Sequence, residues 1–156
     1  MRLDLETFGE KQFSREILRV GRNARDMRPA FDDVHDLIRT VQQKQFSSQG
    51  SAYSGGWAPL APSTRAYKAG ANLDPRILHA TLRLRKSLTT KGDRDHVFRS
   101  SADEMFVGSK VPYGVYHQYG TDRMPRRRPF QFDDKVRNDI VKILQRHLVE
   151  GGAFGR

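Results

Sequence analysis

The chain has 156 residues and a net charge of +10, with 37% hydrophobic and 29% charged residues and a pI near 10.3. This length predicts one domain, and the basic charge favours an acidic partner, which can be nucleic acid or an acidic protein face. Because the sequence has no cysteine, it excludes disulfides, thiol catalysis and the usual thiolate zinc sites.

The opening sequence MRLDLETFGE has no apolar core of signal-peptide length, and no window approaches the ~20 apolar residues of a membrane span. We therefore expect an aqueous, intracellular setting and no membrane partner. Alternating leucines and acidic residues over 2–8 predict a short strand. Apolar side chains at helical spacing predict a helix over 12–20 and a longer one over 29–46. Pro29 suits the first turn of the longer helix.

Residues 47–75 are rich in glycine, serine, proline and alanine, yet they also contain Trp57, the only tryptophan of the chain. Loops of this length are uncommon in compact domains and tend to be functional. We interpret the segment as an extended arm that becomes ordered against a neighbouring subunit, the alternative being a surface loop with an incidental tryptophan. Within it, PSTRAYKAG predicts a short helix capped by Ser63 and ended by Gly70.

The second half of the chain predicts more helices and one hairpin. ILHATLRLRKSL predicts a helix over 77–88, and two apolar runs around the polar SSADE predict a hairpin. A short helix follows Pro112 and ends at Gly120, and a cleaner helix spans 133–149. The fold class is α+β, with a small antiparallel sheet packed against the long helix and the C-terminal helix. We expect one domain over 1–150 and a frayed tail over 151–156.

The sequence offers no enzyme site, cofactor site or metal site. Five histidines are scattered, and none lies at metal-ligand spacing; His35 is expected on the polar side of its helix. His117 would need a partner to act as a base, and Asp122 is the only nearby carboxylate. The acidic runs FDDVHD and FDD lie at predicted helix starts, where capping explains them.

The strongest electrostatic feature is RMPRRRPF, residues 123–130, in which two prolines favour an extended backbone around three arginines. Three interpretations stay open. The arginines can dock onto another protein beside the tyrosines of VPYGVYHQYG, bind phosphates without sequence preference, or lie in solvent.

Four blocks in this order resemble the tailed-phage virion morphogenesis and tail completion proteins: GGWAPLAPSTRAYK, ILHATLRLRKSL, MFVGSKVPYGVYHQYGT and MPRRRPF. The resemblance is close over 55–130 and rests on position alone in the flanking helices. It departs from the family pattern where Ala80-Thr81-Leu82 replaces the usual Asp-Thr-Gly, at Gly114 in place of alanine, and in an extra arginine.

The resemblance implies a structural subunit of the head–tail junction, assembled in the host cytoplasm. It would form a ring, six-fold by expectation, that completes the tail or joins it to the head connector beside other neck, connector and tail-tube proteins. The residues expected at contacts between subunits are Trp57, Leu60, Tyr67, Tyr113, Tyr116, His117, Tyr119, Arg126, Arg127, Arg128 and Phe130. The arginines expected to face DNA in the lumen are Arg123, Arg126, Arg127 and Arg128. The alternative function is non-specific nucleic-acid binding, in which tyrosines stack on bases and arginines bind phosphates.

Overall fold

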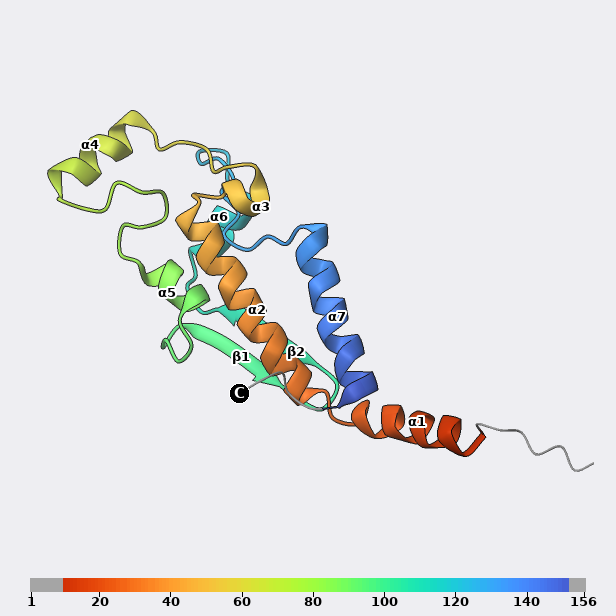
Figure 1. Cartoon of the computed structure of the whole chain (residues 1–156). Coiled ribbons are helices and arrows are strands. Elements are labelled where there is room, and N and C mark those ends of the chain that lie inside the picture. Colours follow the sequence, from red (N-terminus) through yellow and green to blue (C-terminus); the bar gives the residue numbers. More distant parts are fainter. Residues whose placement is uncertain (1–9, 152–156) are drawn as a thin grey trace, which may run out of the picture.

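The computed structural model describes residues 10–151 of the chain (Figure 1). The helices in this range are α1 (Glu10–Asn23), α2 (Arg28–Ser47), α3 (Ser51–Ser54), α4 (Pro62–Gly70), α5 (Arg83–Thr89), α6 (Gly114–Tyr119) and α7 (Asp134–Glu150). The strands are β1 (His96–Ser100) and β2 (Met105–Ser109). The strand predicted over 2–8 lies outside the described residues.

Helix α2 is the central element of the fold. Its apolar side chains recur every three or four residues, and the predicted stripe from Phe31 to Val41 is buried. At its C-terminal end Phe46 is fully buried and joins a core cluster with Trp57, Leu84, Leu88 and Val111. The prediction of a long helix over 29–46 is therefore confirmed.

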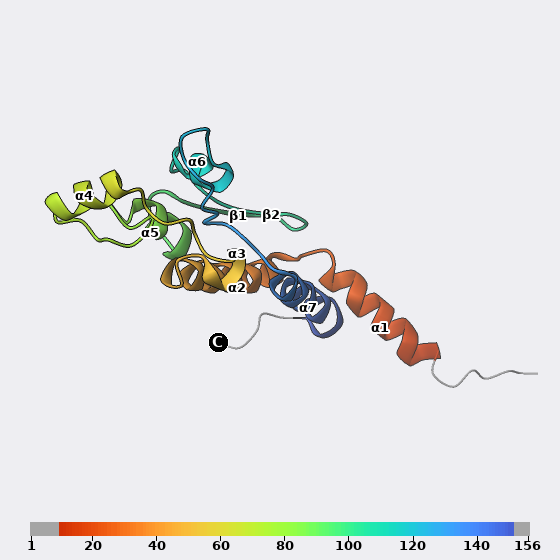
Figure 2. The ribbon, with the colours of Figure 1, turned by 90° about the horizontal axis from the view of Figure 1, so that it is seen from above.

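Strands β1 and β2 form an antiparallel pair, with His96 opposite Ser109 and Ser100 opposite Met105. This hairpin packs on α2 and α5, while α7 packs on α2 and α1. Figure 2 shows the hairpin and α6 on one side of the layer that α2 and α7 form. The α+β class is confirmed, with the difference that the C-terminal helix packs against α2 beside the sheet.

Helix α7 begins where it was predicted because the Asp133 side chain caps it, accepting a hydrogen bond from the Val136 backbone N–H at 2.8 Å. At its other end, the Asn23 side-chain amide donates to the Leu148 carbonyl at 2.9 Å. The imidazole of His147 lies 2.9 Å from the Asp26 carbonyl. These contacts hold only the C-terminal end of α1, and the rest of α1 projects away from the body of the molecule (Figures 1 and 2).

The helix predicted over 77–88 is wrong in its first half, because only α5 forms. Leu78 and Leu82 have φ values of 61° and 57°, which a helix does not contain. One tertiary hydrogen bond anchors the start of this segment, where the Ile77 N–H donates to Gln49 Oε1 at 2.6 Å. This bond and the burial of His79 accompany the non-helical backbone.

Residues 47–75 are more regular than an extended arm, since they contain α3 and α4. The short helix over PSTRAYKAG is confirmed, but Ser63 does not cap it. Its N-cap is Ala61 and Pro62 occupies the first turn, where a missing N–H has no cost.

Candidate assembly surface

Trp57 lies inside its own chain. Its side chain is 7% exposed, and its ring packs edge-on against Phe46 with centroids 5.4 Å apart. The indole N–H donates to the Arg128 carbonyl at 3.0 Å, and the Gln45 side-chain amide donates to the same oxygen at 3.0 Å. The indole is therefore covered by this chain's own core, so the expectation that it reaches a neighbouring subunit needs correction.

Arg127 is also turned inward, with 7% of its surface exposed. Its guanidinium donates to the Ala58 carbonyl at 2.7 Å and to the Pro59 carbonyl at 2.8 Å. Burial lowers the pKa of this guanidinium. Arg127 thus holds the segment beside Trp57 against residues 126–128, and the expectation that its side chain lies open in a DNA-facing lumen needs the same correction.

The other arginines of the run differ in exposure. Arg123 and Arg126 are exposed. Arg128 is half-buried, and its guanidinium donates to Gln131 Oε1 at 3.1 Å. Two of the four arginines expected to face DNA are therefore exposed. Two exposed arginines are few for a groove that follows a phosphate backbone.

Helix α6 forms where VPYGVYHQYG predicted it and ends at Gly120, whose φ of 79° favours glycine. Tyr113 packs against the core. Tyr116, by contrast, is 55% exposed. Together with Val115 and Tyr119, which are 50% and 76% exposed, it forms what we call the α6 surface.

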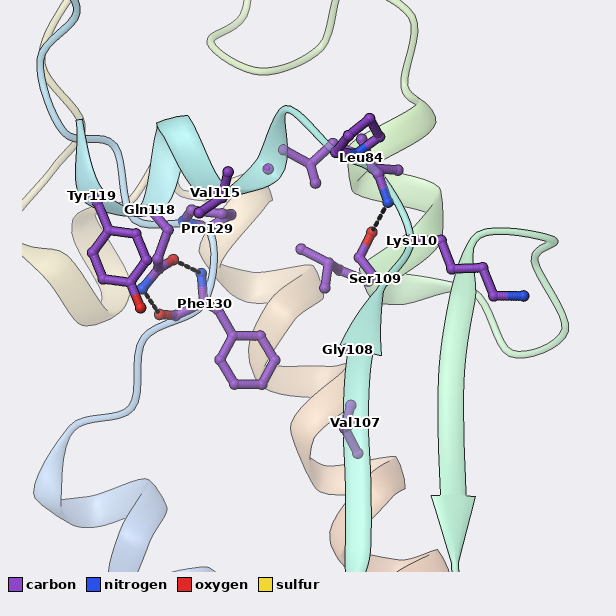
Figure 3. A pocket seen from close by; sticks show the side chains of 14 residues that line it. Leu84, Val107, Gly108, Ser109, Lys110, Val115, Gln118, Tyr119, Pro129 and Phe130 are labelled. Carbon is purple, nitrogen blue, oxygen red and sulfur yellow. Dashed lines mark hydrogen bonds between the residues drawn. The ribbon is translucent and has the colours of Figure 1, made fainter. Parts of the chain in front are cut away.

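Beside this surface lies a cavity of about 480 Å³. Figure 3 shows it between α5, β2, α6 and residues 129–130, with Val107, Val115 and Tyr119 among its lining. Gln118 joins α6 to the backbone of Phe130 by two hydrogen bonds: the Gln118 amide donates to the Phe130 carbonyl at 2.8 Å, and the Phe130 N–H donates to Gln118 Oε1 at 3.1 Å (Figure 3). The α6 surface is therefore attached to one wall of this cavity.

A second apolar surface lies on α1. Phe13, Ile17 and Leu18 are 67%, 56% and 64% exposed, and we call these three the α1 surface. Sequence reasoning recognised the helix but did not assign it to an interface. The available signal was the helical spacing of the apolar residues in α1. This spacing is the same whether the surface that buries them belongs to this chain or to another chain.

A family model described as the phage virion morphogenesis family matches residues 9–149. The chain belongs to this family. No curated protein and no solved structure matches it. Membership confirms the resemblance stated from the four sequence blocks, and it identifies the chain as a structural component of the phage virion.

The remaining predicted contact residues of this virion protein are spread over the α4–α6 end. Tyr67 is exposed on α4, Leu60 and His117 line a second cavity, and Phe130 is half-buried against the core. Burial and the charge of Arg127 lower the pKa of His117. The assignment of these four residues, Leu60, Tyr67, His117 and Phe130, to subunit contacts stays a prediction.

Sequence reasoning missed a histidine pair in this virion protein. His35 was placed on the polar side of its helix, but it is buried and faces β1. Its Nε2 lies 2.9 Å from Nε2 of His96, and its ring stacks on Phe98 with centroids 4.0 Å apart. One imidazole must donate and the other accept, so at least one stays neutral.

Residues 10–151 contain no cluster of three or more histidine or carboxylate side chains that could hold a metal ion. A search of the same residues for a helix with the length and hydropathy of a membrane span finds none.

Proposed function

We propose that this chain is a ring-forming subunit of the phage head–tail junction that completes the tail, joins it to the head connector, or does both. The observation that supports this most is the pair of exposed apolar surfaces, on α1 and on α6, within a member of a virion morphogenesis family. They differ in composition and lie on separate elements (Figures 1 and 2). Two unlike surfaces favour head-to-tail contacts between copies, and such contacts form a ring when the rotation from copy to copy closes.

The energetics favour a closed ring over an isolated pair. The six side chains of the two surfaces are between one half and three quarters exposed, so completing their burial contributes roughly 5–11 kcal/mol. Association of two copies costs about 4–15 kcal/mol. One contact alone is therefore marginal, whereas every subunit of a ring makes two contacts. We expect few dimers and a cooperative transition from monomer to ring.

The test is the size of the particle that the full chain forms, measured by native mass spectrometry and negative-stain electron microscopy over a range of concentrations. Wild type should form rings. Ile17→Asp on the α1 surface and Tyr119→Asp on the α6 surface should each leave a folded monomer with an unchanged circular dichroism spectrum. Val141→Asp, which changes an exposed apolar residue of α7 outside both surfaces, is the matched control and should still form rings.

Two results would contradict the proposal. One is a wild-type chain that stays monomeric at every concentration. The other is ring formation by both aspartate variants. Duplex DNA added to the same samples separates the alternative function, since a nucleic-acid-binding protein should bind it tightly at low salt and lose that binding steeply as salt rises.

A further inference from the structure

A second cavity, of about 420 Å³, lies between α4, the segment 77–84, α6 and residues 123–127. Its walls combine aliphatic side chains, including Leu60, Ile77 and Leu84, with basic ones. Among the described residues that line it, none is acidic. The cavity therefore has the composition of a site for a ligand that is both negatively charged and apolar.

Two of the lining cations are buried and bind only backbone carbonyls. Lys68 is 6% exposed, and its ammonium donates to the Asp74 carbonyl at 2.8 Å and to the Arg76 carbonyl at 2.7 Å. The Asp74 carboxylate itself is engaged by the Arg76 guanidinium. Arg127, described above, binds the carbonyls of Ala58 and Pro59. Burial lowers the pKa of both cations.

Buried charges are normally paired, because removing a charge from water is costly without a counter-charge. Here the carbonyl dipoles supply only part of that compensation. In addition, Nδ1 of His117, which also lines the cavity, is buried without a hydrogen-bond partner. Arg123 completes the lining with an exposed side chain. Four basic side chains thus converge on one cavity that has no carboxylate in its lining.

We propose that this cavity binds residues 3–8 of a neighbouring copy, Leu-Asp-Leu-Glu-Thr-Phe, through the carboxylates of Asp4 and Glu6. The segment carries two negative charges, no positive charge and three large apolar side chains, which matches the basic and aliphatic lining. This inference rests on the proposed head-to-tail ring and names the segment that passes between neighbouring copies.

The position of the segment in the chain supports a partner copy as its destination. Residues 3–8 directly precede α1, and Figures 1 and 2 show α1 and α4 at opposite ends of the molecule. If the α1 surface of one copy contacts the α6 surface of the next, the residues before Glu10 arrive beside that copy's α6. Tyr113 and His117, at α6, line the cavity. A DNA phosphate suits the site less well, because the duplex backbone offers only the small C–H groups of deoxyribose to the aliphatic walls and no large apolar side chain.

The first experiment measures peptide binding by fluorescence anisotropy. The receptor is the full chain with Asp4→Arg and Glu6→Arg, so that its own segment cannot occupy the cavity. A labelled peptide of residues 1–10 should bind, and the same peptide with Asp4→Asn and Glu6→Gln should bind at least tenfold more weakly. Equal binding of both peptides, or binding that is unchanged when Arg123→Glu is added to the receptor, would overturn the proposal.

The second experiment measures assembly. Asp4→Arg with Glu6→Arg should raise the concentration for half-assembly at least tenfold, and adding Arg123→Glu should recover part of that loss. Asp103→Arg with Glu104→Arg, an equal charge change at the exposed hairpin turn, is the matched control and should shift it less than twofold. Equal shifts in both double variants would show general charge repulsion and overturn the proposal.

The outcomes separate this inference from the proposed function. If wild type forms rings and the assembly of all the charge variants is unchanged, the proposed ring is supported and the binding of residues 3–8 to a neighbouring copy is refuted. If the peptide binds with the expected charge dependence but wild type forms no ring, the cavity is supported as the binding site of residues 3–8 and the proposed ring is refuted. Loss of DNA binding in Arg123→Glu with unaltered assembly and peptide binding would assign this arginine to DNA and overturn its role here.

Discussion

Trp57→Ala distinguishes a core tryptophan from an interface tryptophan. The substitution removes a buried indole that packs on Phe46 and donates to the Arg128 carbonyl. Replacing a buried tryptophan by alanine costs about 3–5 kcal/mol when the surroundings relax only partly. The Arg128 carbonyl keeps its second donor, Gln45, so the lost hydrogen bond adds only about 1 kcal/mol.

The expected total of about 4–6 kcal/mol is a large fraction of the ~5–15 kcal/mol that stabilises a typical domain. With a urea m-value of about 2 kcal/mol per M, the unfolding midpoint should fall by roughly 2–3 M, if the folded state survives at all. Far-UV circular dichroism is the suitable signal because the substitution removes the only tryptophan. Trp57→Phe keeps a ring against Phe46 and should cost only about 1–2 kcal/mol.

Tyr119→Ala is the matched control, since it truncates an exposed aromatic residue of the α6 surface. It should change the free energy of unfolding of the monomer by less than about 0.5 kcal/mol. All melts belong at a concentration where the chain is monomeric, because assembly stabilises the folded state by mass action. The reasoning is refuted if Trp57→Ala unfolds at the wild-type urea concentration while losing the ability to assemble.

Two further predictions concern the same core and the histidine pair. Gly50→Ala should destabilise the fold by at least about 1 kcal/mol, because Gly50 has a φ of 85° and an added Cβ would overlap the indole of Trp57. A urea unfolding midpoint equal to that of wild type would contradict this prediction. Stability should fall as pH drops below about 6.5, because burial and the neighbouring His96 lower the pKa of His35, so the unfolded chain takes up a proton that the folded chain refuses. His79 shifts in the same direction through burial, and an NMR titration that showed His35 protonating at or above its ordinary pKa would contradict the assignment.

The sequence allowed the long helices, the hairpin and α6 to be predicted, because each carries a local signal. The stripe of α2, the cap at Asp133 and the stop at Gly120 act within one element. The first half of the helix predicted over 77–88 did not form, because the competing interactions come from distant positions. The Ile77 N–H finds its acceptor on Gln49, and no local pattern reports that pairing.

The predicted contact residues likewise divide into those whose exposure a local pattern predicts and those whose burial depends on distant contacts. Aromatic residues and arginines are enriched at interface hot spots, and aromatic residues also fill protein cores, so composition alone could not tell whether Trp57 and Arg127 face inward or outward. Trp57 and Arg127 turned out to stabilise each other's segments, through Arg128 and through Ala58 and Pro59. The exposed tyrosines of α6 and the projecting α1 carry the surfaces that remain open.

The most direct measurement of the central claim, contact between α1 of one copy and α6 of the next, is a cysteine cross-link. The native chain has no cysteine, so Ile17→Cys and Tyr119→Cys introduce the only thiols. With a short bis-maleimide, a chain carrying both substitutions should give a ladder of covalent oligomers that ends at the size of the closed ring. Either cysteine alone should give only monomers. A dimer from one cysteine alone, or no ladder from the chain with both, would contradict the head-to-tail arrangement.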